Sequence, residues 1–107
     1  MKAVDLRPDF FASNALLGAT LFTLKEDEAA YPVLAHAYEL NPQDVDVASL
    51  LFKTSMLLAE QRWSRKEYQE SMGFLQKANA LRPDDTEAQK RLTEVKALLG
   101  KKIGSNP

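Results

Sequence analysis

The stretch KANALRPDD, residues 77–85, contains the pattern that organises the whole chain. Its frame is an Ala, a Leu three residues later and a Pro two residues after that Leu. The same frame occurs in KAVDLRPDF at residues 2–10 and in HAYELNPQD at residues 36–44. One short pattern therefore occurs three times in 107 residues.

The spacing of these frames indicates a repeat architecture. Their prolines are Pro8, Pro42 and Pro83. The interval from Pro8 to Pro42 equals the length of a helix–turn–helix repeat, which is about 34 residues. The interval from Pro42 to Pro83 is longer by seven residues, which is about two helical turns. We expect one additional turn on each helix of the second pair.

Each frame is predicted to end one helix and to precede the next. Proline lacks an amide hydrogen and disfavours the helical conformation of the residue before it, so a helix ends there. Asp44 and Asp85 follow Pro42 and Pro83 by two residues. Aspartate is a favoured N-cap residue, because its carboxylate accepts hydrogen bonds from free amides of the first turn.

The sequence predicts five helices, which cover residues 9–24, 27–40, 45–61, 64–81 and 86–99. Ser64 and Glu67 have the spacing of a capping box at the fourth helix. Gly100 is a predicted C-cap of the last helix. Pro32 and Gly73 lie at equivalent positions and predict a bend in their helices, or in the case of Pro32 a split.

The frame resembles the tetratricopeptide repeat (TPR). Leu17 and Gly18 fall at the Leu–Gly positions of that family, and the later small, large, small and Pro positions are occupied by Ala30, Leu34, Ala37 and Pro42. The second unit has Leu51 at the Leu position, and counting back from Pro83 gives Ala78, Leu75 and Ser71. The second unit departs from the family pattern in two ways. It is longer, and Phe52 replaces the small residue that Gly18 supplies in the first unit. We expect Trp63 and Tyr68 to fill the extended end of this pair.

The resemblance implies an all-α fold, an antiparallel helix-pair solenoid that forms a segment of a right-handed superhelix with a C-terminal capping helix. We interpret the chain as a single TPR-like domain. Its parts are the end of a preceding repeat (2–8), repeat one (11–44), extended repeat two (45–85), the capping helix (86–100) and a flexible tail (101–107).

The first and last helices differ in their apolar patterns. Residues 9–24 are apolar around nearly the whole circumference, which is typical of a helix that is buried on several sides. The last helix has one stripe only, formed by Ala88, Leu92, Val95 and Leu99, and its outer face, with Lys90, Arg91 and Glu94, suits a terminal cap. We therefore expect a fragment of a longer repeat protein. The alternative is a small protein whose first helix pairs with another copy. If the first helix has lost its neighbour, its exposed apolar face predicts a homodimer through Phe10, Phe11, Ala15 and Phe22.

Composition excludes several classes of function. Lys+Arg is 14 and Asp+Glu is 15, which gives no general attraction to nucleic acid. The chain has one His and no Cys, and the four glycines do not form a phosphate-binding loop, so we expect no catalytic site, cofactor or metal. No apolar run predicts a membrane span or a secretory signal, and the location is not indicated. Arg62, Arg65 and Lys66 form a basic cluster, which is interpreted as a solvated helix junction or as a contact for an acidic partner or phosphate.

TPR proteins bind peptides or partner helices in a groove lined by the first helix of each pair, and the resemblance places that groove here. The first unit contributes Ala12, Ala15, Leu16, Ala19, Phe22 and Thr23, and the second contributes Asp46, Ser49, Leu50, Lys53, Met56 and Leu57. This lining is small and apolar, which favours an amphipathic helix or an apolar peptide. The expected function is a non-catalytic protein–protein interaction scaffold.

Three alternatives remain at this point. In the first, the chain is the repeat portion of a larger enzyme, such as a glycosyltransferase. In the second, it serves mainly for self-association. In the third, it is a helical module of a transcription regulator. The near-neutral charge and the lack of a basic recognition helix disfavour the last of these.

Overall fold

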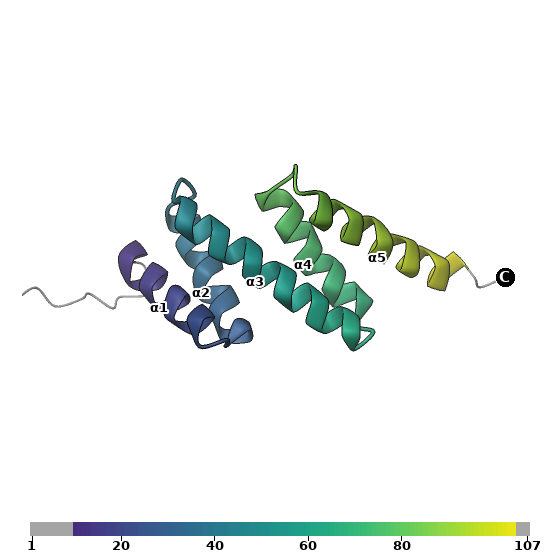
Figure 1. The fold of residues 1–107 in the computed structure, drawn as a ribbon, viewed down its shortest axis with the longest axis horizontal. Helices are drawn as coiled ribbons and strands as arrows, with labels where there is room; N and C mark the ends of the chain where they lie inside the picture. The colour runs from purple at the N-terminus through teal and green to yellow at the C-terminus, as the bar shows by residue number, and fades with distance from the viewer. Residues whose placement is uncertain (1–9, 105–107) are drawn as a thin grey trace, which may run out of the picture. The chain divides into compact units, whose positions relative to one another are not determined.

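The computed structural model describes residues 10–104, and within them the chain is all-α (Figure 1). The described part has no strand. Its helices are α1 (Phe11–Thr23), α2 (Asp27–Leu40), α3 (Val45–Ser64), α4 (Tyr68–Leu81) and α5 (Thr86–Gly104). The all-α prediction is confirmed. The predicted end of a preceding repeat, residues 2–8, lies outside the described residues.

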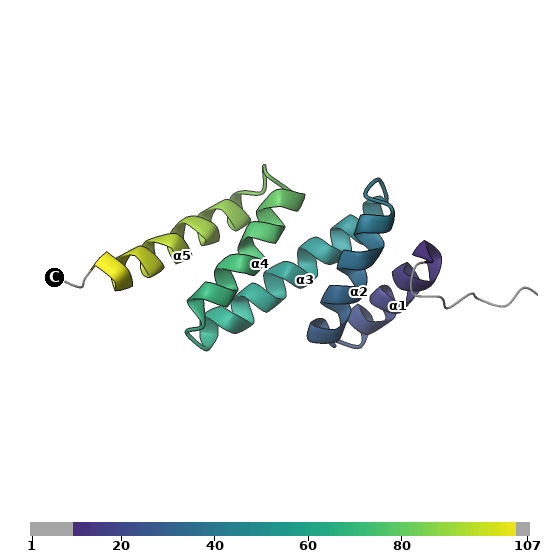
Figure 2. The same cartoon turned by 180° about the vertical axis from the view of Figure 1, so that it is seen from behind.

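The chain divides into two compact units, residues 1–54 and 55–107. The division falls inside α3, so this helix contributes ten residues to each unit. In the first unit α1 and α2 lie side by side, and in the second unit α4 and α5 do so in both views (Figures 1 and 2). The buried side chains of the first unit include Ala30, Leu34, Ala37, Val47 and Leu51, and those of the second include Ala59, Leu75, Leu92 and Val95.

The two aspartates that follow Pro42 and Pro83 act as N-caps, as predicted. The Asp44 carboxylate accepts a hydrogen bond from the amide of Val47 at 2.9 Å. The Asp85 carboxylate accepts one from the amide of Ala88 at 2.8 Å. The position before α1 is occupied by Phe10, which makes no side-chain cap. Two of the three helices that follow a repeated frame therefore begin at the same kind of cap.

The seven extra residues of the second pair all lie in α3. This helix has 20 residues and α1 has 13, whereas α2 and α4 have 14 each. The prediction of one additional turn on each helix is wrong. A heptad rotates the helix by only about 20° from two full turns, so α3 takes the whole insertion and keeps its buried face.

The loop between α3 and α4 differs from the predicted capping box at Ser64. Helix α3 continues to Ser64, whose hydroxyl donates to the carbonyl of Gln61 at 2.8 Å, and α4 begins only at Tyr68. The loop instead has the conformation of the α1–α2 loop. Lys25 has φ 63° and Lys66 has φ 62°. Each loop has the hydrogen bonds of a Schellman motif, which ends a helix with a left-handed residue.

Lys66 follows Lys25 at the same spacing in sequence as Pro83 follows Pro42. This common repeat spacing also corrects the role predicted for Phe52. Gly18 lies against Leu34 in the first unit, and the same offset gives Ala59 and Leu75, which share the core cluster of the second unit. Phe52 is buried one heptad before Ala59 on the same helix. The small residue required at the close helix approach is therefore present as Ala59, and Phe52 does not replace it.

Two positions that weaken helices leave their helices continuous. Pro32 lies inside α2 and does not split it, and Gly73 lies inside α4. A Cβ atom added at Gly73 would have no neighbour within 4 Å. Packing therefore does not require a glycine at this site.

The last helix has the predicted buried stripe but a different end and a different outer face. Ala88, Leu92 and Val95 are buried. Gly100 does not end the helix, because α5 continues to Gly104, and residues 101–104 of the predicted flexible tail are helical. Arg91, predicted to face outward, instead lies over the Trp63 ring at 4.4 Å from its centroid and pairs with Glu60 at 2.9 Å.

Candidate partner-binding surfaces

The twelve residues predicted to line a groove lie on α1 and α3, and none of them is buried. Six are exposed and six are partly buried. The exposed ones are Ala12, Leu16, Thr23, Asp46, Lys53 and Leu57, and the partly buried ones are Ala15, Ala19, Phe22, Ser49, Leu50 and Met56. These side chains are therefore available for contact on their own helices.

Helix α1 exposes an uncharged surface. Its sequence, FASNALLGATLFT, contains no charged residue. Leu16 is 56% exposed and Leu17 is 49% exposed, and Leu24 directly after the helix is 61% exposed. Exposed apolar residues that lie together, with no charge among them, mark an interaction surface more often than isolated ones do.

One stripe of this helix, which we name the α1 face, consists of Ala12, Leu16, Ala19, Thr20 and Thr23. The Thr20 hydroxyl donates to the carbonyl of Leu16, and that of Thr23 donates to the carbonyl of Ala19, both at 2.9 Å. Their hydrogen-bonding demand is thus met within the helix. A shallow hollow of about 240 Å³ lies at the end of this face, lined by Ala19, Thr20, Thr23 and Leu24.

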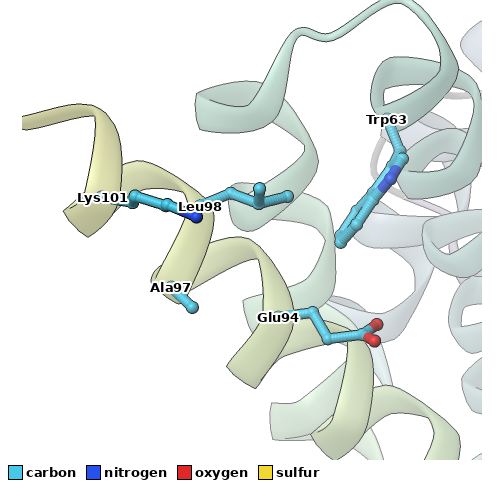
Figure 3. Close-up of a pocket in the computed structure, with 5 residues that line it drawn as sticks. All are labelled: Trp63, Glu94, Ala97, Leu98 and Lys101. Carbon is cyan, nitrogen blue, oxygen red and sulfur yellow. The ribbon is translucent and has the colours of Figure 1, made fainter. Parts of the chain in front are cut away.

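A second hollow, of about 340 Å³, lies in the second unit. Trp63 of α3 forms one side, and four residues of α5, Glu94, Ala97, Leu98 and Lys101, form the other (Figure 3). Leu98 points across the hollow toward the indole ring. The site is therefore an apolar centre with an acidic and a basic residue beside it.

Trp63 is held in place by aromatic and cationic neighbours. It packs partly buried against the core of the second unit, as does Tyr68, and their ring centroids are 5.7 Å apart in an edge-to-face arrangement. The guanidinium of Arg91 covers its ring. Trp63 and Tyr68 thus fill this end of the pair as expected, while Trp63 still presents a surface to the hollow.

The α5 side of this hollow was not among the predicted site residues, although the sequence contains a signal for it. Asp44 and Asp85, the caps of α3 and α5, define the offset between these two helices. Shifting the predicted positions Lys53, Met56 and Leu57 by that offset gives Glu94, Ala97 and Leu98. Extending the repeat register to the last helix would therefore have placed three of the five lining residues.

Two members of the basic cluster beside Trp63, Arg62 and Arg65, pair with acidic neighbours. The Nε atom of Arg62 lies 2.8 Å from a carboxylate oxygen of Glu70 and 3.8 Å from one of Glu67. Arg65 lies 3.9 Å from Glu67. This arrangement favours the interpretation of a solvated helix junction over that of a contact for an acidic partner.

A metal site and a membrane span each require a particular arrangement of residues. Within residues 10–101 no three His, Asp or Glu side chains are grouped so that they could hold a metal ion. Burial raises the pKa of Tyr31 above its ordinary value, and this phenol lies on α2, away from both hollows in sequence. Among the described helices none is long and apolar enough to cross a membrane.

Comparison of the chain with protein-family models, with curated proteins and with solved structures gave no match.

Proposed function

We propose that this chain is a TPR-like helical repeat module that binds an amphipathic helix of a partner protein through the α1 face. The observation that carries the proposal is the exposed and uncharged surface of α1, where Leu16 is 56% exposed. Its members Ala12, Leu16, Ala19 and Thr23 are spaced at i, i+4, i+7 and i+11. A straight stripe of this kind suits a second helix that lies along it.

The internal repeat supports the assignment to a repeat module. Helices α1 and α2 form one pair, and the second half of α3 forms another with α4. The two pairs have the same loop conformation, and the same repeat spacing relates the small and large buried residues of one pair to those of the other. A module of this type binds and does not catalyse. The exposed residue Lys53 of α3, which lies in the same unit as α1, is a further proposed contact.

A peptide selection tests the proposal. The chain is presented to a phage-displayed library of random 16-residue peptides, and the affinity of enriched peptides is measured by calorimetry. We expect enriched sequences with apolar residues at i, i+3 or i+4, and i+7. Leu16→Glu should weaken their binding at least tenfold, about 1.4 kcal/mol, because it places a charge in the apolar contact.

Gln76→Glu is the matched control, since Gln76 is an exposed position of α4 outside the proposed surface. It adds the same charge and should leave the affinity unchanged. Each variant must retain the helical circular dichroism spectrum of the wild type. Selection without enrichment, or enriched peptides whose affinity is the same for Leu16→Glu, would contradict the proposal.

A further inference from the structure

The outer side of α5 carries a short, ordered pattern of residues. Glu94, Ala97, Leu98 and Lys101 are spaced at i, i+3, i+4 and i+7, so they form one face of the helix beside the hollow (Figure 3). This face is separate from the buried stripe that includes Leu92. Along it, an acidic residue comes first, two apolar residues follow, and a basic residue is last.

This pattern is its own complement. If a second α5 lies antiparallel along the first, with a two-fold axis between positions 97 and 98, Glu94 of each copy faces Lys101 of the other. Ala97 of each copy then faces Leu98 of the other, so a large side chain meets a small one on both sides of the axis. We propose that a second copy of this chain docks here and forms a two-fold symmetric dimer through α5.

The side chains of this face are free to make these contacts. Leu98 is 36% exposed and Ala97 is exposed. Within the described residues Lys101 makes no ion pair, and Glu94 makes only a long contact, 3.5 Å, with Arg91. The hollow of about 340 Å³ beside Trp63 gives the apolar side chains of the second copy a surface on which to pack.

The charges and the apolar residues have different roles in this contact. Exposed ion pairs contribute little to affinity, so Glu94 and Lys101 chiefly select the antiparallel direction and the register. Burial of Leu98 supplies the attraction. The opposed helix directions also bring opposite ends of the two helix dipoles together. A contact of about two helical turns is small, so the dimer should be weak and concentration-dependent.

The dimer goes beyond the proposed binding of a partner helix and does not depend on it. It uses α5, and it differs from the α1–α1 homodimer that the sequence suggested through Phe11. Each copy would still present its own α1 face. Peptide binding that survives Leu98→Glu, together with a dimer that survives Leu16→Glu, would establish the two sites as independent.

Sedimentation equilibrium of the full chain, up to about 1 mM, tests the inference. We expect a monomer–dimer equilibrium, and Leu98→Glu should raise its dissociation constant at least tenfold, about 1.4 kcal/mol. Glu94→Lys alone and Lys101→Glu alone should each dissociate the dimer, because each places like charges opposite one another. An equimolar mixture of these two variants should restore association, since all facing charges are then opposite.

Lys96→Glu is the control, because Lys96 is exposed on the opposite side of α5 and its reversal should change nothing. Circular dichroism checks that each variant remains folded. Lys101→Glu removes no ion pair or hydrogen bond within the described residues, so it reports on association even if Glu94→Lys disturbs Arg91. A wild type that stays monomeric at about 1 mM overturns the inference. So does a mixture no more associated than its components, or a dimer that Phe11→Glu dissociates and Leu98→Glu does not.

Discussion

Gly18 lies so close to Leu34 that a Cβ atom added to the glycine would be 2.5 Å from the Leu34 Cδ2 atom and 2.7 Å from its Cγ. Leu34 is fully buried, so its side chain has little room to move away. The approach of α1 to α2 therefore requires a glycine at this position.

Gly18→Ala should lower the free energy of unfolding by about 1–3 kcal/mol, the usual cost of an overpacked core. Gly73→Ala is the matched substitution, because its added methyl group meets nothing within 4 Å. It should raise the free energy of unfolding by about 0.5–1 kcal/mol through helix propensity alone. Urea denaturation of both variants measures the difference. Equal effects at the two glycines would show that the helices separate freely at Gly18.

A second matched pair concerns two buried serines. The Ser71 hydroxyl donates to the carbonyl of Ala59 at 2.8 Å, across from α4 to α3. The Ser55 hydroxyl is also buried but has no hydrogen-bond partner within the described residues. Ser71→Ala should cost about 1 kcal/mol, and Ser55→Ala should be neutral or stabilising, since it removes an unsatisfied polar group. Thermal unfolding compares them, and a larger loss for Ser55→Ala would contradict the hydrogen-bond assignment.

The N-caps give a third prediction. Asp85→Ala should destabilise the chain by about 0.5–2 kcal/mol, because the carboxylate bonds the amide of Ala88. Asp84→Ala removes the same charge one residue earlier, at an exposed position, and serves as the control. Denaturation of the two variants at one ionic strength separates capping from charge. Similar losses for both would mean that the cap contributes nothing beyond electrostatics.

The fourth prediction is a pH dependence. Burial raises the pKa of Tyr31 above its ordinary value of 10.0. The folded state then retains the phenol proton over a pH range in which the unfolded state has lost it, so unfolding becomes easier as the pH rises above about 10. Tyr31→Phe lacks this ionisation. The stability of the wild type should therefore fall relative to that of Tyr31→Phe in alkaline denaturation series, and parallel curves would show that Tyr31 ionises equally well in the fold.

The parts of the fold that the sequence predicted correctly depend on local signals. The bounds of α2, Asp27–Leu40, agree with the prediction, because a loop and an Asn-Pro pair limit the helix on either side. The caps at Asp44 and Asp85 and the buried stripe of α5 also agree. Each of these follows from side chains that act within one or two turns.

The errors arose where two solutions satisfy the same local pattern. An insertion of seven residues keeps the buried face of whichever helix receives it, so the pattern could not assign it to α3 alone. Ser64 can cap a new helix or bond back to Gln61, and the structure has the second arrangement. Gly100 can end a helix or lie within one, and α5 continues past it.

The candidate surfaces also include one part that the sequence predicts and another part that it does not. The exposure of Leu16 and Leu57 follows from the repeat register, which the sequence contains. The hollow beside Trp63 depends on the last turns of α3 and on the position of Arg91, and the sequence places neither. Repetition of the Lys-Glu pair at residues 25–26 and 66–67 was the available clue to the true end of α3.

The shared helix α3 has a consequence for attempts to dissect this protein. A cut between Thr54 and Ser55, where the two units divide, leaves ten helical residues on each fragment. Isolated helices shorter than about 12–15 residues are marginal in water. Each fragment would therefore end in a segment that the missing half no longer extends. Mixing the two fragments, rather than studying either alone, is the experiment in which helical structure should be regained.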